Sequence, residues 1–253
     1  MELVIIALAA LLTSWLTLIS GFGLGTLLLP VFALFFEIEL AIALTAIVHV
    51  LNNIFKFGLL WKWVDRKTVL WFGIPGILGA ILGVGLLSIL GSGTPWFESG
   101  SIVVQPLPAV IGLLMIFFAL TELFPKILQF NFQKKFLIPG GLLSGFFGGL
   151  SGHQGALRSM FLIKAGLSKE AYIATGVAIA LLVDFTRIPM YFSRMPNGMM
   201  SAHSVAILVA TSSAFLGAVI GKKMMNKITL RAVQVTVGIL MILLGIGLFL
   251  GII

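Results

Sequence analysis

The amino-acid sequence predicts an all-α polytopic membrane protein. Of its 253 residues, 60% are hydrophobic and only 9% are charged, and the mean hydropathy is +1.18. A soluble domain carries about 25% charged residues, so this chain has too little polar surface to face water on all sides. Its apolar stretches run unbroken instead of alternating with a period of two, which excludes a transmembrane β-barrel. Lipid is therefore the expected solvent.

Six apolar stretches are long enough to cross a bilayer, because a crossing helix needs about 20 apolar residues. They span residues 40–61, 68–90, 103–124, 171–192, 203–221 and 231–252. Two further regions, 3–36 and 137–166, are too long for one crossing and too short for two. Each contains a glycine-rich break, at Ser20–Gly25 and at Ser144–Gly155, which predicts a re-entrant hairpin of two half-length helices.

The distribution of charge favours this topology. If both hairpins are re-entrant and all six stretches cross, one side receives Glu2, Glu37, Glu39, Glu98 and a single basic residue, Arg194. The basic residues of the other side are Lys62, Arg66, Lys67, Lys126, Lys134, Lys135, Lys164, Lys169, Lys222, Lys223, Lys227 and Arg231. Loops rich in Lys and Arg mark the cytoplasm, so both termini are expected on the outer side. The net charge of +8 then follows from topology and indicates no nucleic-acid partner.

The two halves of the chain resemble each other at an offset of 131 residues. The positions that match are Ser20 with Ser151, Gly21 with Gly152, Glu39 with Glu170, Asn53 with Asp184, and Lys56 with Arg187. We therefore predict one integral membrane domain of two repeats, 1–125 and 137–253, joined by a cytoplasmic linker at 126–136. Each repeat has one hairpin and three crossing helices, an odd number, so the second repeat is inverted. Inverted repeats with broken helices are typical of secondary transporters, which bind substrate near the bilayer midplane.

Both predicted repeats resemble a known family. The first contains SGFGLGTLLLP followed by ALTAIVHVLNNIFKF, and the second contains GGLSGHQGALRSMFLIKAGLSKEAYIATG. With these segments nearly the whole chain resembles the TauE/SafE sulfite-exporter family of permeases. The resemblance implies a multi-pass protein of the cell inner membrane that moves sulfite, organosulfonates or related small anions. It implies a class of cargo, because the family has no known residue pattern that fixes the substrate.

Four polar residues share one face of the stretch 40–61. His49, Asn52, Asn53 and Lys56 stand at i, i+3, i+4 and i+7. Exposure of such a stripe to lipid costs several kcal/mol, so it is expected to face the protein interior or a water-filled pathway. The alternative is hydrogen bonding between helices, with Lys56 reaching the cytoplasmic interface.

Two arginines and an aspartate lie within other apolar segments. Asp184 and Arg187 are three residues apart, which is compatible with a structural ion pair. Alternatively, Arg187 presents a planar two-point donor to a sulfite or sulfonate oxygen, while Asp184 positions it or carries a proton. Arg158 is expected either to bind the anion or to pair with Glu170 or Glu122.

The glycine-rich breaks are expected to form opposed hairpin tips near the membrane centre. Glycine lets the backbone approach a ligand closely, and N–H groups at broken helix ends favour an anion. The predicted substrate-binding residues are Gly21, Gly23, Gly25, His49, Asn53, Lys56, Gly152, His153, Gln154, Arg158 and Arg187. Asp184, His49 and His153 are the predicted proton carriers, since burial and neighbouring charge shift such groups into a useful range.

The sequence thus predicts a secondary transporter for a small sulfur-containing or organic anion, exporting by alternating access. Its expected partners are that anion and the lipid bilayer, and proton coupling and a homodimer are left open. No Walker A, HExxH or GxSxG pattern occurs, and the chain has no cysteine, so no cofactor, catalytic residue or metal site is predicted. An anion channel and, more remotely, an intramembrane enzyme are the alternatives.

Overall fold

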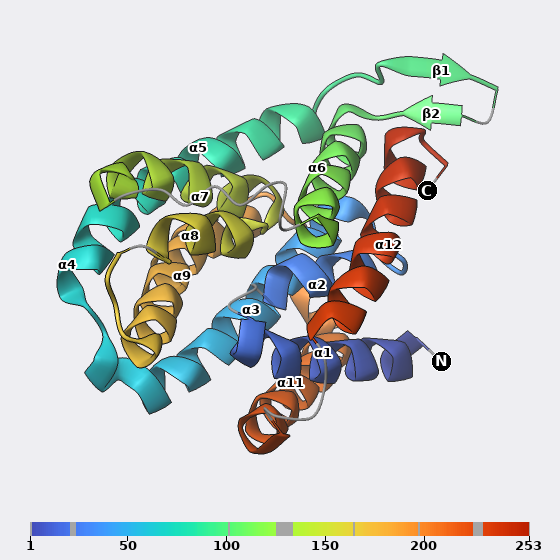
Figure 1. Cartoon of the computed structure of the whole chain (residues 1–253). Helices are drawn as coiled ribbons and strands as arrows, with labels where there is room; N and C mark the ends of the chain where they lie inside the picture. Colours follow the sequence, from blue (N-terminus) through green and yellow to red (C-terminus); the bar gives the residue numbers. More distant parts are fainter. Residues whose placement is uncertain are drawn as a thin grey trace. The chain divides into compact units, whose positions relative to one another are not determined.

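The computed structural model describes residues 2–20, 24–100, 102–124, 134–163, 165–196, 198–224 and 230–252. Nearly all of the regular structure is helical (Figure 1). The first half contains α1 (Glu2–Ser20), α2 (Leu24–Phe32), α3 (Ile38–Leu60), η1 (Trp61–Trp63), α4 (Arg66–Thr68), η2 (Val69–Gly73), α5 (Ile74–Gly91), β1 (Phe97–Ser99), β2 (Ile102–Val104) and α6 (Pro106–Leu123). The second contains η3 (Lys134–Phe136), α7 (Leu137–Ser151), α8 (Gln154–Leu162), α9 (Lys169–Phe192), α10 (Met199–Ala202), α11 (Ser204–Met224) and α12 (Leu230–Phe249).

The prediction of an all-α membrane protein is confirmed. Within the described part of the chain, three helical segments are long and apolar enough to cross a membrane, namely Ile38–Trp63, Arg66–Gly91 and Lys169–Phe192. Shorter apolar helices cover parts of the other predicted crossings. The crossing predicted at 103–124 begins later than expected. Residues Ile102–Val104 pair with Phe97–Ser99 as a short antiparallel hairpin, and Pro106 starts α6, a position where proline costs no helical hydrogen bond.

Each region predicted as a re-entrant hairpin is described as two helices, and residues 21–23 of the first region lie outside the described residues. α1 ends at Ser20 and α2 begins at Leu24, while α7 ends at Ser151 and α8 begins at Gln154. The arms are unequal, which corrects the expectation of two half-length helices. α1 has 19 residues and α7 has 15, whereas α2 and α8 have nine each. At 1.5 Å per residue, α1 alone is about as long as a bilayer core is thick.

The chain divides into two compact units. The second unit comprises residues 85–130 and 228–253, and in it α6 packs along α12 (Figure 1). The helices approach so closely at Gly112 and Gly245 that a Cβ on Gly112 would collide with the Gly245 carbonyl oxygen. Small residues at such crossings let apolar helices gain packing contacts that lipid cannot replace.

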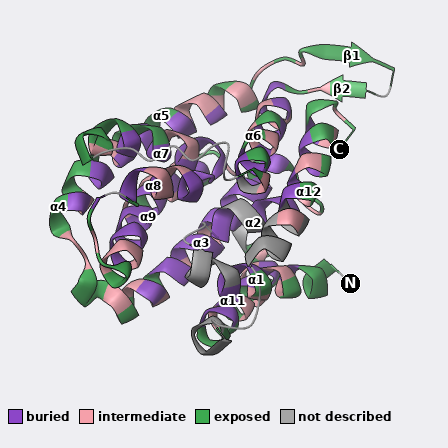
Figure 2. Cartoon of the chain, viewed as in Figure 1, coloured by how far each residue is buried: buried purple, intermediate pink, exposed green. Residues whose placement is uncertain are grey.

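The first unit comprises residues 1–84 and 131–227 and holds all the predicted polar residues that the structure describes. Within it α1 packs along α11, and α3 packs along α9. α7 lies on η2 and the start of α5, because Gly141, Gly145 and Gly149 bring its backbone against that of Phe72, Gly76 and Ala80. Figure 2 shows that α3 and α9 are the most continuously buried helices, so they form the interior of this unit.

Candidate functional site

A buried carboxylate joins the two central helices of the first unit. Asp184 on α9 and His49 on α3 are separated by 135 residues, yet Asp184 Oδ2 lies 2.6 Å from His49 Nδ1. Asp184 Oδ1 accepts a hydrogen bond of 2.9 Å from Arg187 Nε, and Arg187 Nη2 lies 2.8 Å from the same oxygen. Gln154 Nε2 donates to that oxygen at 3.3 Å. We call these four residues the Asp184 centre.

Helical spacing explains how each side chain reaches this centre. Asp184 and Arg187 are three residues apart on α9 and therefore point to the same side. On α3, Asn53 follows His49 by one turn, and its amide nitrogen lies 3.2 Å from Nδ1 and 3.3 Å from Nε2 of the imidazole. The short contact with a carboxylate places the His49 proton on Nδ1, because Asp184 can only accept when ionised. The result is a charged group held from two helices and one hairpin.

The second hairpin tip is attached to α9 through the same arginine. Arg187 Nη1 donates a 2.7 Å hydrogen bond to the carbonyl oxygen of Gly148, and the Tyr191 hydroxyl donates to Gly149. Gly152 follows the last residue of α7, and its φ of +80° is a conformation that favours glycine. A Cβ on Gly152 would lie 3.2 Å from Arg187 Nη1. The tip therefore approaches the arginine most closely when residue 152 has no side chain.

The start of α2 lies against the break between α7 and α8. A Cβ on Gly25, at the start of α2, would lie 3.1 Å from the Gly152 carbonyl oxygen and 3.7 Å from Thr45 Cγ2. α2 and α8 are in contact as well. Gly25 and Gly152 thus come together as the spacing of the glycine breaks predicts. Gly21 and Gly23, also predicted at this tip, lie outside the described residues.

Buried charge around the centre is unbalanced. Among the described residues, the buried Lys, Arg, Asp and Glu side chains are Lys56, Arg158, Asp184 and Arg187. Only Asp184 is negative, and its ion pairs are with Arg187 and His49. Arg158 forms no ion pair with a described residue, and its Nη1 has no hydrogen-bond partner there. A buried cation without a counter-charge is costly, so an anion is the natural complement.

Other buried polar atoms also lack partners within the described part of the chain. They include Thr45 Oγ1 and Asn52 Nδ2 on α3, Gln154 Oε1 at the start of α8 and Arg187 Nη2 on α9. Each such atom costs about 1–3 kcal/mol unless a ligand or water satisfies it. Polar groups left unsatisfied at a helix break indicate a site that something else enters.

Most of the predicted site residues are buried in this unit, although not all reach the centre. His49, Asn53, Gln154, Asp184 and Arg187 come together, and the ion pair left open as an alternative for Asp184 and Arg187 is present. Of the other site residues, His153 Nδ1 lies 3.0 Å from Ser151 Oγ, Lys56 is buried on α3, and Arg158 forms no ion pair with a described residue. The alternative partner Glu170 is exposed, and the side chain of Glu122 lies outside the described residues.

Sequence reasoning missed three contributors to this region. Thr45 lies one turn before His49 on the polar face and is 2% exposed. Its helical spacing from His49 is a sequence signal that extends the polar stripe by one turn. Ser144 Oγ donates a 3.0 Å hydrogen bond to the Gln154 carbonyl oxygen, which braces the hairpin. The contact from Tyr191 to Gly149 joins residues 42 apart and has no local signal.

Apolar helices of spanning length, glycine-broken hairpins and a buried charged centre define a multi-pass helical membrane permease. The particular family follows from comparison with known proteins. A family model described as sulfite exporter TauE/SafE matches residues 6–248, and the chain belongs to this family. Its members are transporters, so this chain is a transporter and not an enzyme. No curated protein and no solved structure was found to match the chain.

Proposed function

We propose that this protein is a secondary transporter that exports a small sulfur-containing or organic anion of the sulfite, sulfonate or sulfoacetate type. The observation that carries the proposal is the excess of buried cations beside the tip of a broken helix, with Arg158 lacking a counter-charge among the described residues. The family match supports an anion of this class. The proposed location is the inner membrane of the cell.

Arg158 supplies the first counter-charge for the anion in this proposal. Arg187 donates hydrogen bonds from Nε to Asp184 Oδ1 and from Nη1 to the Gly148 carbonyl oxygen, and its Nη2 lies 2.8 Å from Asp184 Oδ1 in an ion pair without hydrogen-bond geometry. The Nη1 of Arg158 has no such acceptor, and its residue is 8% exposed. An entering anion therefore gains most at Arg158 without breaking an existing ion pair. Arg187 binds the anion only after Asp184 releases it.

A proton on Asp184 would release Arg187 in this scheme. The carboxylate loses its negative charge on protonation, so its attraction for both Arg187 and His49 falls together. Arg187 then becomes available to an anion, while the His49 contact between α3 and α9 weakens. Anion binding and proton uptake are thereby linked through one carboxylate, which makes Asp184 and His49 the proposed proton carriers.

Alternating access is proposed to arise from two inverted repeats, 1–125 and 137–253. Support comes from how the helices exchange partners between the repeats. α1 of the first repeat packs on α11 of the second, and α7 of the second packs on η2 of the first. α3 and α9, which correspond in the two repeats, pack on each other. Rocking of one repeat against the other would expose a site between them alternately on each side.

Flux into proteoliposomes tests the proposal. The candidate substrates to compare are sulfite, sulfate, taurine, sulfoacetate and simple carboxylates. We expect saturable transport of sulfite or of an organosulfonate. Arg158→Gln should abolish anion binding in isothermal titration, whereas Arg194→Gln, which removes an exposed arginine, should leave it unchanged. Equal binding in both variants would contradict the role of Arg158. Electrogenic flux far above carrier turnover would identify an anion channel instead.

A further inference from the structure

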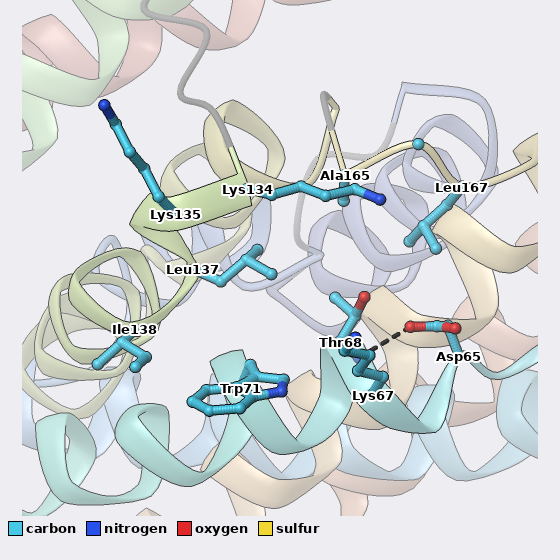
Figure 3. A pocket seen from close by; sticks show the side chains of 11 residues that line it. Asp65, Lys67, Thr68, Trp71, Lys134, Lys135, Leu137, Ile138, Ala165 and Leu167 are labelled. Atoms are coloured by element: carbon cyan, nitrogen blue, oxygen red, sulfur yellow. Dashed lines mark hydrogen bonds between the residues drawn. The ribbon is translucent and has the colours of Figure 1, made fainter.

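A cavity of about 550 Å³ lies away from the Asp184 centre, within the first unit. Its walls come from the start of the helical segment Arg66–Gly91, from η3 and the start of α7, and from the loop that precedes α9 (Figure 3). This volume lies in the range that holds a drug-sized molecule, which is far larger than a single oxyanion. The transport mechanism proposed above makes no use of this cavity.

One side of the cavity is strongly basic. Lys67, Lys134 and Lys135 line it, and none of them forms an ion pair with a residue that the structure describes. Figure 3 shows Lys134 extended across the cavity, and its Nζ lies 3.3 Å from where a Cβ on Gly166 would stand. Lys135 points away from the cavity in Figure 3, and its Nζ lies 5.2 Å from the centre of the Phe136 ring, so the charges at the cavity are those of Lys67 and Lys134.

The one carboxylate in the lining does not neutralise these lysines. Asp65 Oδ1 accepts a 2.8 Å hydrogen bond from the backbone N–H of Thr68, which caps the first turn of the helix. The backbone N–H of Asp65 donates to Thr175 Oγ1 at 2.9 Å, so the residue is tied to α9. The hydrogen bonds from Thr68, followed by the charges of Lys134 and Lys67, lower the pKa of Asp65. Asp65 supplies one negative charge against the three lysines of the lining, so the lining has a net positive charge.

Other residues of the lining are apolar, and Figure 3 shows Trp71 on the same helical segment as Lys67. Trp71 is 52% exposed and Ile138 is 47% exposed, although both belong to apolar helical segments. A free inorganic oxyanion gains nothing from these side chains. An amphiphile contacts both kinds of lining residue, because its anionic head pairs with the lysines and its hydrocarbon body packs on Trp71 and Ile138.

We propose that this cavity binds the headgroup of an anionic phospholipid. Its phosphate lies between Lys67 and Lys134, and the start of its acyl chains lies along Trp71 and Ile138. The lysines belong to the face that the charge distribution assigns to the cytoplasm, where the leaflet carries anionic lipids. Basic pockets between membrane helices on that side suit such headgroups, and tryptophan is enriched at the same depth.

Native mass spectrometry of the purified full chain, titrated with phosphatidylglycerol or phosphatidylcholine, tests the proposal. We expect tighter binding of phosphatidylglycerol and a loss of roughly 30-fold in Lys67→Gln/Lys134→Gln, since each lysine near a lipid surface contributes about fivefold. Lys62→Gln/Lys169→Gln removes two exposed charges from the same predicted face outside the cavity and should retain binding. If the first double variant does not fold, Lys134→Gln alone should lose about fivefold.

A second arm separates a lipid from a free oxyanion. Excess inorganic phosphate should fail to displace phosphatidylglycerol, and Trp71→Ala should weaken the lipid severalfold. Equal losses in the two double variants would show attraction by the whole basic face and overturn the proposal. Displacement by phosphate, with binding insensitive to Trp71→Ala, would overturn it in favour of a free-anion site.

Discussion

Replacement of Asp184 by asparagine tests whether the Asp184 centre holds the first unit together. The side chain keeps its shape, so no cavity forms, but its charge disappears. Arg187, which is fully buried, then loses its only ion-pair partner among the described residues. Removal of one partner from a buried ion pair costs about 3–5 kcal/mol, because the remaining charge stays desolvated. That is a large part of a total stability of about 5–15 kcal/mol.

Equilibrium unfolding in mixed micelles of mild detergent and SDS, followed by circular dichroism, measures this loss. Glu98→Gln makes the same chemical change at an exposed position and should shift stability by no more than about 0.5 kcal/mol. Adding Arg187→Gln to Asp184→Asn removes the unpaired charge as well, so the double variant should be more stable than Asp184→Asn alone. If the two losses simply add, the two side chains are not coupled and the reasoning about this centre is wrong.

Three further predictions concern the hairpin tip, the topology and the cap. Gly152→Leu should abolish anion binding in isothermal titration, while gel filtration should show that the protein stays folded. The reason is that a side chain at this position meets Arg187 Nη1 and that φ is +80°. Retained affinity would show that the tip is only a packing surface. Single cysteines at Glu98 and Lys67 should react with an impermeant label from opposite sides of the membrane, and labelling from one side would refute the topology. Asp65→Ala should cost about 1 kcal/mol at pH 7. Because the folded-state pKa of Asp65 is lowered, its contribution is present above the ordinary value of 3.8 and is lost as the pH falls through the folded-state value, so thermal melts of both forms should converge in acid.

Local sequence was sufficient for the class of protein and for the positions of the helix breaks. Long apolar stretches predict helices in lipid because every backbone group must be satisfied within the segment. Glycine-rich segments within such stretches predict breaks, and α7 does stop just before Gly152, which has a positive φ. The polar stripe that begins at His49 predicts a buried face because lipid exposure of these groups is costly, and His49 is 3% exposed.

Other features had no local signal. The unequal arms of the hairpins and the short strands before α6 depend on where each segment meets its neighbours. The three-residue spacing of Asp184 and Arg187 was equally compatible with a structural ion pair and with an anion-binding site. The spacing along α9 says nothing of His49, which comes from a helix 135 residues away.

Sequence alone therefore predicted an all-α membrane protein and showed that Lys56, Arg158, Asp184 and Arg187 fall within apolar segments. Tertiary structure decided which of them touch. Packing of α3 against α9 brings His49 to Asp184, and Arg187 engages the tip of α7 through Gly148. That packing leaves Arg158 without a described counter-charge. The physical reason is range: burial in lipid depends on the residue and its immediate neighbours along one helix, whereas the partner of a buried charge depends on the docking of helices distant in sequence.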